Sequence, residues 1–214
     1  GRFDADKEVY HVQGGKKLRL SRPQQLMAAE REIIEEAYAG DIIGVFDPGI
    51  FSIGDTLCAP GKKFRFDPIP TFAPEHFKRV RSLDTMKRKQ VLKGMEQIAQ
   101  EGAIQIFKTP YTGMEEVIVG VVGTLQFDVL EYRLKNEYNV ELYMEGLPYE
   151  YLRWIETDDG EPVKEEDLIL GTDVKLVEDY KGNQLLLFGS QWAIGWTEER
   201  NKNLTFHEFG GTKF

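Results

Sequence analysis

The fold is decided by Val117-Ile118-Val119-Gly120-Val121-Val122-Gly123-Thr124-Leu125-Gln126-Phe127-Asp128, in which an apolar run passes directly into the start of a helix. A short apolar run bounded by turn residues is typical of a buried strand. Thr124 is a residue type that caps helices, and Phe127, Leu130 and Leu134 follow at helical spacing. The stretch therefore predicts a strand over 116–122 and a helix that ends at Asn139, a residue that tolerates left-handed backbone.

The residues on either side repeat this pattern. An apolar series at helical spacing, with Val91 and Met95 at its centre, lies between a candidate cap, Asp84, and a candidate stop, Gly102. Three further strands are expected over 76–81, 103–107 and 140–144. The predicted order is strand, helix, strand, strand, helix, strand. This split βαβ order folds as one antiparallel ferredoxin-like sheet with both helices on one face.

The first part of the chain has a different pattern, because short strands alternate with turn residues. The expected strands cover residues 17–21, 32–36, 42–46 and 50–53, with a Pro-Gly turn at 47–49. Prolines and glycines gather between 58 and 74 and indicate a domain boundary. We therefore expect a mixed β and α+β fold. A partial β-barrel over 1–62, lacking its N-terminal strands, precedes an α+β domain over 63–214.

The C-terminal extension after residue 151 is expected to contain one strand over 152–155 and a hairpin. Its strands, 174–177 and 184–188, flank Lys181-Gly182-Asn183. A short helix is expected over 191–203. Trp192 and Trp196 lie four residues apart there, and we interpret them as core or interdomain packing rather than a ligand box.

The composition excludes several classes of site. The single cysteine, Cys58, forms no intrachain disulfide and no Cys-based zinc cluster. The three histidines are far apart in sequence, and no stretch has the spacing of a phosphate-binding loop. We therefore expect no catalytic, cofactor or metal site in this chain. The chain also shows no signal peptide at its start and no membrane-spanning run, so we expect a cytoplasmic protein without membrane contact.

One segment departs from the acidic character of the chain. Residues 78–93 include seven basic residues and one acidic residue, Asp84, so the net charge of this segment is +6. Because the whole chain has a net charge of −9, the rest of the chain carries −15. A basic patch on an acidic protein is a typical footprint for a phosphate backbone. The alternative interpretation is the solvated outer face of a helix. The candidate ribosome or RNA contacts are Lys78, Arg79, Arg81, Lys87, Arg88, Lys89 and Lys93.

Several motifs together resemble a known family. Ala37-Tyr38-Ala39-Gly40-Asp41-Ile42-Ile43-Gly44 and Ile53-Gly54-Asp55-Thr56-Leu57 resemble the second, β-barrel domain of translational GTPases. Lys89-Gln90-Val91-Leu92-Lys93-Gly94 and Val119-Gly120-Val121-Val122-Gly123-Thr124-Leu125-Gln126-Phe127-Asp128 resemble the peptide chain release factor 3 family. Elongation factor G has Gly-Glu-Leu-His where this chain has Gly123-Thr124-Leu125-Gln126, which favours the release factor.

The resemblance implies a function in translation termination. The family's parent protein is a GTPase that removes class I release factors from the ribosome. Its GTP and magnesium are expected only in an N-terminal domain that this chain lacks. The chain itself is then a non-catalytic, ribosome-docking part. Its implied partners are ribosomal RNA and protein, a class I release factor and its own missing GTPase domain.

Two other functions compete with this interpretation. A stand-alone phosphatase on a ferredoxin-like sheet would use Arg79 or Arg81 to hold an anion, although no glycine-rich loop precedes the first helix. A small-molecule-binding regulatory domain is the other alternative.

Overall fold

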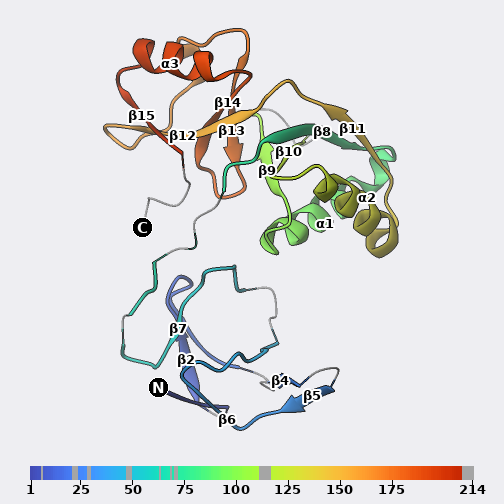
Figure 1. Ribbon diagram of the computed structural model, residues 1–214, viewed down its shortest axis with the longest axis vertical. Helices are drawn as coiled ribbons and strands as arrows, with labels where there is room; N and C mark the ends of the chain where they lie inside the picture. The colour runs from blue at the N-terminus through green and yellow to red at the C-terminus, as the bar shows by residue number, and fades with distance from the viewer. Residues whose placement is uncertain are drawn as a thin grey trace. The chain divides into compact units, whose positions relative to one another are not determined.

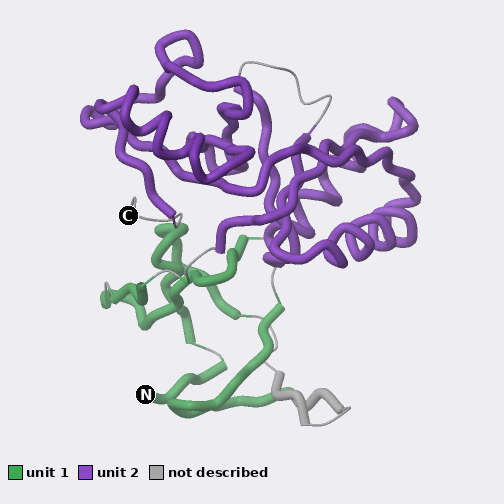
Figure 2. Tube along the Cα trace, turned by 45° about the horizontal axis from the view of Figure 1, so that its top comes forward, with its two compact units in different colours: residues 1–69 green, residues 70–214 purple. Residues whose placement is uncertain are grey.

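The computed structural model describes residues 1–5, 7–20, 24–27, 30–46, 50–62, 64–67, 69, 72–110 and 117–208 (Figure 1). The chain divides into two compact units, Gly1–Ile69 and Pro70–Phe214 (Figure 2). The turn expected at 47–49 lies outside the described residues. Two expectations stay predictions: the domain boundary between residues 62 and 63, and the absence of the N-terminal strands of the barrel.

The first unit contains short antiparallel strands in three small sheets. β1 pairs with β6, β2 lies between β3 and β7, and β4 pairs with β5. These described strands do not close into a barrel. Their bounds are β1 Arg2–Asp4, β2 Glu8–His11, β3 Lys16–Arg19, β4 Gln24–Met27, β5 Glu30–Ile33, β6 Glu36–Tyr38 and β7 Leu57–Cys58.

Two of the strands expected in this unit are absent. Residues 42–46 contain only an isolated bridge at Gly44, and residues 50–53 have no strand. Exposure explains the difference, because Ile42, Phe46 and Ile53 stay 87%, 69% and 62% accessible and so anchor no sheet face. The strand expected over 32–36 is divided between β5 and β6.

The second unit confirms the ferredoxin-like prediction. Its four strands lie in the order β11-β8-β10-β9, all antiparallel, and α1 and α2 pack together. The bounds are β8 His76–Ser82, η1 Thr85–Lys87, α1 Arg88–Gln100, β9 Gln105–Lys108, β10 Val117–Val121, α2 Leu125–Tyr138 and β11 Leu142–Gly146.

The C-terminal extension continues the same sheet. Its strands add to β9 in the order β13-β14-β12-β15, which gives an eight-stranded antiparallel sheet. The bounds are β12 Tyr151–Thr157, η2 Glu165–Asp167, β13 Val174–Asp179, β14 Gln184–Phe188, α3 Gln191–Arg200 and β15 Leu204–His207. Only two residue pairs join β9 to β13, so the sheet can bend between its two halves.

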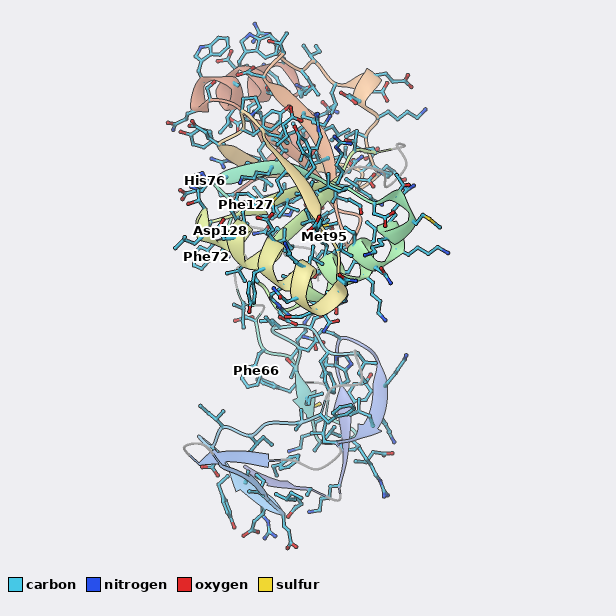
Figure 3. The ribbon with its side chains drawn as sticks, turned by 90° about the vertical axis from the view of Figure 1, so that its right-hand side faces the viewer. Phe66, Phe72, His76, Met95, Phe127 and Asp128 are labelled. Carbon is cyan, nitrogen blue, oxygen red and sulfur yellow. The ribbon has the colours of Figure 1, made fainter. Side chains whose placement is uncertain are left out.

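Three apolar clusters show how the layers stack. Helices α1 and α2 cover one face of the first four strands, where Met95 and Phe127 lie in the core (Figure 3). The opposite face, with Phe77 and Ile118, packs against Leu185 in the C-terminal half of the sheet. The outer face of that half is covered by α3, at the far end of this unit from α1 and α2 (Figure 1).

The start of α2 differs from its prediction. Thr124 occupies the cap position, yet its side chain makes no capping hydrogen bond. The Gln126 side chain instead bonds back to the residues that precede the helix: its Oε1 accepts from the backbone N–H of Val122 at 3.0 Å and of Gly123 at 2.9 Å. Its Nε2 donates to the Ala103 carbonyl at 2.6 Å and so joins α2 to the loop before β9.

Trp192 is 72% exposed on α3, so core packing is wrong for this side chain, and interdomain packing stays a prediction. The residues of α3 that are buried are Ala193, Ile194 and Thr197. Trp196 is only partly buried.

Candidate nucleic-acid interface

The seven basic candidates lie on β8, η1 and α1, and their side chains have three different environments. Alternation along β8 places Lys78 on the helix-covered face with Val80, and Arg79 and Arg81 on the opposite face. The other four candidates follow Asp84 at the start of the first helical segment.

Lys78 is turned toward the core of its own unit. Its Nζ lies 4.5 Å from the centroid of the Phe127 ring, which is buried beneath α2. A cation over an aromatic face is attracted by the ring quadrupole. Lys78 is therefore already engaged within the unit, even though its side chain stays partly accessible.

Arg79 and Arg81 lie beside residues of β11, the neighbouring strand at one edge of the sheet. The register places Arg79 opposite Glu145, and Arg79 Nη1 lies 3.3 Å from Glu145 Oε2. Burial raises the pKa of the Tyr149 phenol, and the positive charge of Arg79 opposes that shift. Arg81 lies opposite Tyr143, with its guanidinium carbon 4.6 Å from the ring centroid. Both members of this second pair are exposed, so Arg81 stays accessible to solvent beside the Tyr143 ring.

A short capped turn connects β8 to α1. Asp84 Oδ1 accepts from the Met86 backbone N–H at 2.9 Å, and the Ser82 hydroxyl donates to the Asp84 carbonyl at 2.6 Å. Asp84 therefore caps η1 rather than α1 itself. Lys87 Nζ donates to the Asn139 carbonyl at 2.7 Å and joins this turn to the end of α2.

Lys89 and Lys93 stand one helical turn apart on the outer face of α1. Both are exposed, whereas Val91, Gly94, Met95 and Ile98 face the core. Within the described part of the chain neither lysine has a hydrogen bond or ion pair. Arg88 is half-buried beside them.

Two apolar side chains were missed by the sequence analysis. Leu83 and Met86 lie in the turn between the basic residues, 58% and 93% exposed. The sequence could have indicated them only through their place in a turn, where an apolar side chain has no core to pack into. The β8–α1 junction therefore carries exposed Arg81, Lys89 and Lys93 together with two exposed apolar side chains, Leu83 and Met86.

This arrangement suits binding. Arginine and lysine donors contact phosphate oxygens, while an exposed aromatic or apolar side chain contacts bases or protein. Among the described residues no three His, Cys, Asp or Glu side chains form a group that could hold a metal ion. Within the same ranges, each helix is either too short or too polar to cross a bilayer.

Comparisons with known proteins agree with the division into two units. The family described as "Class II release factor RF3, C-terminal domain" matches residues 66–198, and "Elongation factor G domain 2" matches residues 1–60. The chain is similar to the protein named peptide chain release factor 3 in Symbiobacterium thermophilum, with 50% identity over 206 residues. The same name applies to relatives in Gloeobacter violaceus, at 44% over 208 residues, and Listeria monocytogenes, at 42% over 204 residues.

The coverage of these matches is unequal. They include 96%, 97% and 95% of this chain but only 38%, 39% and 38% of the three relatives. The chain therefore spans less than two fifths of the length of the relatives that it matches.

Proposed function

Since the chain belongs to the class II peptide chain release factor 3 family, we propose that it forms the ribosome-docking part of a translation termination factor. The observation that supports docking is the β8–α1 junction, where Arg81, Lys89 and Lys93 are exposed along with the apolar side chains of Leu83 and Met86. The ribosome offers phosphate oxygens and protein side chains side by side, and such a junction has donors and apolar area for both.

Charge distribution supports an oriented contact. The segment 78–93 carries +6 in a chain whose total charge is −9. A phosphate-rich surface attracts this segment and repels the acidic remainder, so electrostatics favours one orientation of docking. Lys78, Arg79 and Lys87 already have partners within the unit. We therefore assign direct contact first to Arg81, Lys89 and Lys93, with Arg88 beside them.

The activity of the whole protein extends this proposal. The full-length factor would hydrolyse GTP with magnesium in a separate GTPase domain and release class I release factors from the ribosome in the cytoplasm. The chain described here would couple that domain to the ribosome and perform no chemistry itself. Such coupling requires two states with different contacts.

The alternative of a phosphatase finds little support in the geometry. Its proposed anion holder Arg79 is paired with Glu145, and Arg81 lies over Tyr143. The turn before α1 is fixed by Ser82 and Asp84 side chains rather than by a glycine-rich loop.

The test is ribosome binding of a double charge reversal, Lys89→Glu with Lys93→Glu. We expect weaker co-sedimentation with 70S ribosomes. The slope of log affinity against log salt should also become less steep, by about 1.4 to 1.8, because each of the two lost phosphate contacts removes roughly 0.7 to 0.9. Because both side chains are exposed, the thermal unfolding midpoint should not change.

The matched control is Lys164→Glu with Lys181→Glu, which changes the net charge by the same amount at exposed positions outside segment 78–93. If both double variants lose affinity equally, the effect comes from total charge and the proposed surface is wrong. Unchanged binding of the Lys89 and Lys93 variant would also reject it.

A further inference from the structure

An aromatic ladder runs along α3. Trp192, Trp196 and Arg200 follow one another at intervals of four residues. The two indole centroids are 6.4 Å apart, and the Arg200 guanidinium carbon lies 4.0 Å from the Trp196 ring centroid. Arg200 Nη1 also donates to the Trp196 carbonyl at 3.2 Å. Trp196 is thus enclosed between an indole and a guanidinium, whereas Trp192 is 72% exposed at the open end of the ladder.

Gly195 lies between the two tryptophans and has no structural role within the unit. It is exposed in the helix interior, its φ is not positive, and an added Cβ would meet no atom within 4 Å. Glycine is the least favourable residue in a helix interior after proline. A glycine at an exposed helix position leaves room beside Trp192 for another backbone to approach closely.

The acidic side chains near the ladder come mainly from a neighbouring loop. On α3 itself exposed Glu198 and Glu199 are balanced by Arg200 and, just after the helix, by Lys202, and Glu199 Oε2 lies 3.9 Å from Arg200 Nη1. The Asn201 side chain, at the end of the helix, exchanges two hydrogen bonds with the Ile169 backbone, at 2.9 and 3.0 Å. These bonds hold Ile169, which lies within the loop 158–173, and this loop contains seven acidic residues and one basic residue. Phosphate would be repelled here, whereas lysine and arginine side chains would be attracted.

We propose that Trp192, Gly195, Trp196 and Glu199 form a docking surface on α3 for a basic polypeptide segment. An arginine or lysine of the partner lies on the open face of Trp192 and continues the stack begun by Arg200. The partner backbone passes over Gly195, and the acidic side chains pair with its other cations. This surface lies on the opposite layer from the β8–α1 junction, so the inference stands independently of the proposed ribosome contact through that junction (Figure 1).

The test is fluorescence anisotropy with the whole chain and three labelled probes. These are a 12-residue peptide of alternating Arg and Leu, the same peptide with Glu in place of Arg, and a 12-nucleotide uridine RNA. We expect binding of the Arg-Leu peptide alone, and a loss of affinity of at least ten-fold in Trp192→Ala. The unfolding midpoint of this variant should stay unchanged, because the side chain makes few contacts within the unit.

Gly195→Ala gives a second readout that keeps both indoles. Its unfolding midpoint should rise, since alanine favours the helix, while its affinity for the Arg-Leu peptide should fall at least three-fold. The matched control is Tyr180→Ala, which removes another aromatic residue with 52% exposure and a lysine 5.6 Å from its ring centroid. Its affinity should equal that of the unsubstituted chain.

Three results would overturn the proposal. They are absence of binding by the Arg-Leu peptide, equal affinity of Trp192→Ala and the unsubstituted chain, and RNA binding that depends on Trp192. The last result would make the ladder a base-stacking surface instead.

Discussion

Lys87 donates its Nζ to the Asn139 carbonyl at 2.7 Å, across 52 positions of sequence. Asn139 is the left-handed cap of α2, with φ 52°. This carbonyl carries the negative end of the helix dipole, so a cation there stabilises the helix. The contact fixes the β8–α1 turn to the neighbouring helix.

Replacement of Lys87 by methionine should therefore lower the free energy of unfolding by about 1 kcal/mol. Urea unfolding followed by circular dichroism measures this. Lys93→Met is the control, because Lys93 is exposed and has no such contact in the described chain. Equal loss in both variants would show that the Asn139 contact contributes nothing.

At Gly120, on β10, the side chains of Pro74 and Phe107 pack closely against the backbone. A Cβ at this position would lie 2.7 Å from Pro74 Cγ and 2.8 Å from Phe107 Cε2, two groups that are buried and rigid. Gly120→Ala should lower the free energy of unfolding by about 1 to 3 kcal/mol. Gly146→Ala on β11, where nothing lies within 4 Å, should leave it nearly unchanged. A chemical denaturation midpoint for each variant decides the point. Equal stability of the two variants would mean that Pro74 yields without cost.

The start of α2 offers a comparison between two neighbouring residues. Gln126→Ala removes hydrogen bonds to Val122, Gly123 and Ala103 and should cost about 2 kcal/mol of unfolding free energy. Thr124→Ala removes no capping bond and should change stability by less than about 0.5 kcal/mol. Differential scanning calorimetry on both variants tests this. A larger loss for Thr124 would restore the cap that the sequence predicts.

This comparison shows what sequence reasoning can and cannot reach. Local periodicity identified both helices that cover the first half of the sheet, because Val91, Met95, Phe127 and Leu130 bury one face of each. The strand order followed from the sequence of elements. Gln126, rather than Thr124, holds the start of α2, and one of its hydrogen bonds is to Ala103, more than twenty positions away. A contact at that separation leaves no pattern in the local sequence.

The candidate site shows the same limit. The sequence identified seven basic residues, but strand alternation and packing separate them, with Lys78 over Phe127 and Arg81 over Tyr143. The contribution of Met86 was missed because an apolar residue carries no charge signal. The pairing of β13 with β9 could not be predicted from the sequence either, because the pairing of strands far apart in the chain leaves no periodic pattern.

Arg133 links the two helices through two carboxylates. It hydrogen-bonds Glu137, at 2.8 and 3.0 Å, and also Glu101 at the end of α1. The hydrogen bonds from Arg133 hold the pKa of Glu137 below its ordinary value. The stability gained is present above the ordinary glutamate pKa of the unfolded chain and is lost as the pH falls through the lowered pKa of the folded chain.

The expected result is a difference between variants rather than a total. Urea midpoints from pH 7 to pH 3 should fall less steeply for Arg133→Met than for the unsubstituted chain. Lys135→Met removes an exposed ion pair with Glu141 and should keep the original slope. Asp4 and Asp159, whose pKa values are also lowered, contribute equally to all three proteins. Parallel curves for Arg133→Met and the unsubstituted chain would contradict the linkage.

The stack of Arg81 on Tyr143 connects the fold most directly to the proposed ribosome contact. If Tyr143 orients the guanidinium, Tyr143→Leu should weaken 70S binding about two- to five-fold, the range expected for an exposed cation–π contact of about 0.5 to 1 kcal/mol. In an Arg81→Ala background the same change should have no further effect, because nothing remains to be oriented. Tyr132→Leu, at an exposed tyrosine on α2, is the matched control. Additive losses in the double variant would mean that Tyr143 touches the ribosome itself, and Arg81 would then be only its neighbour.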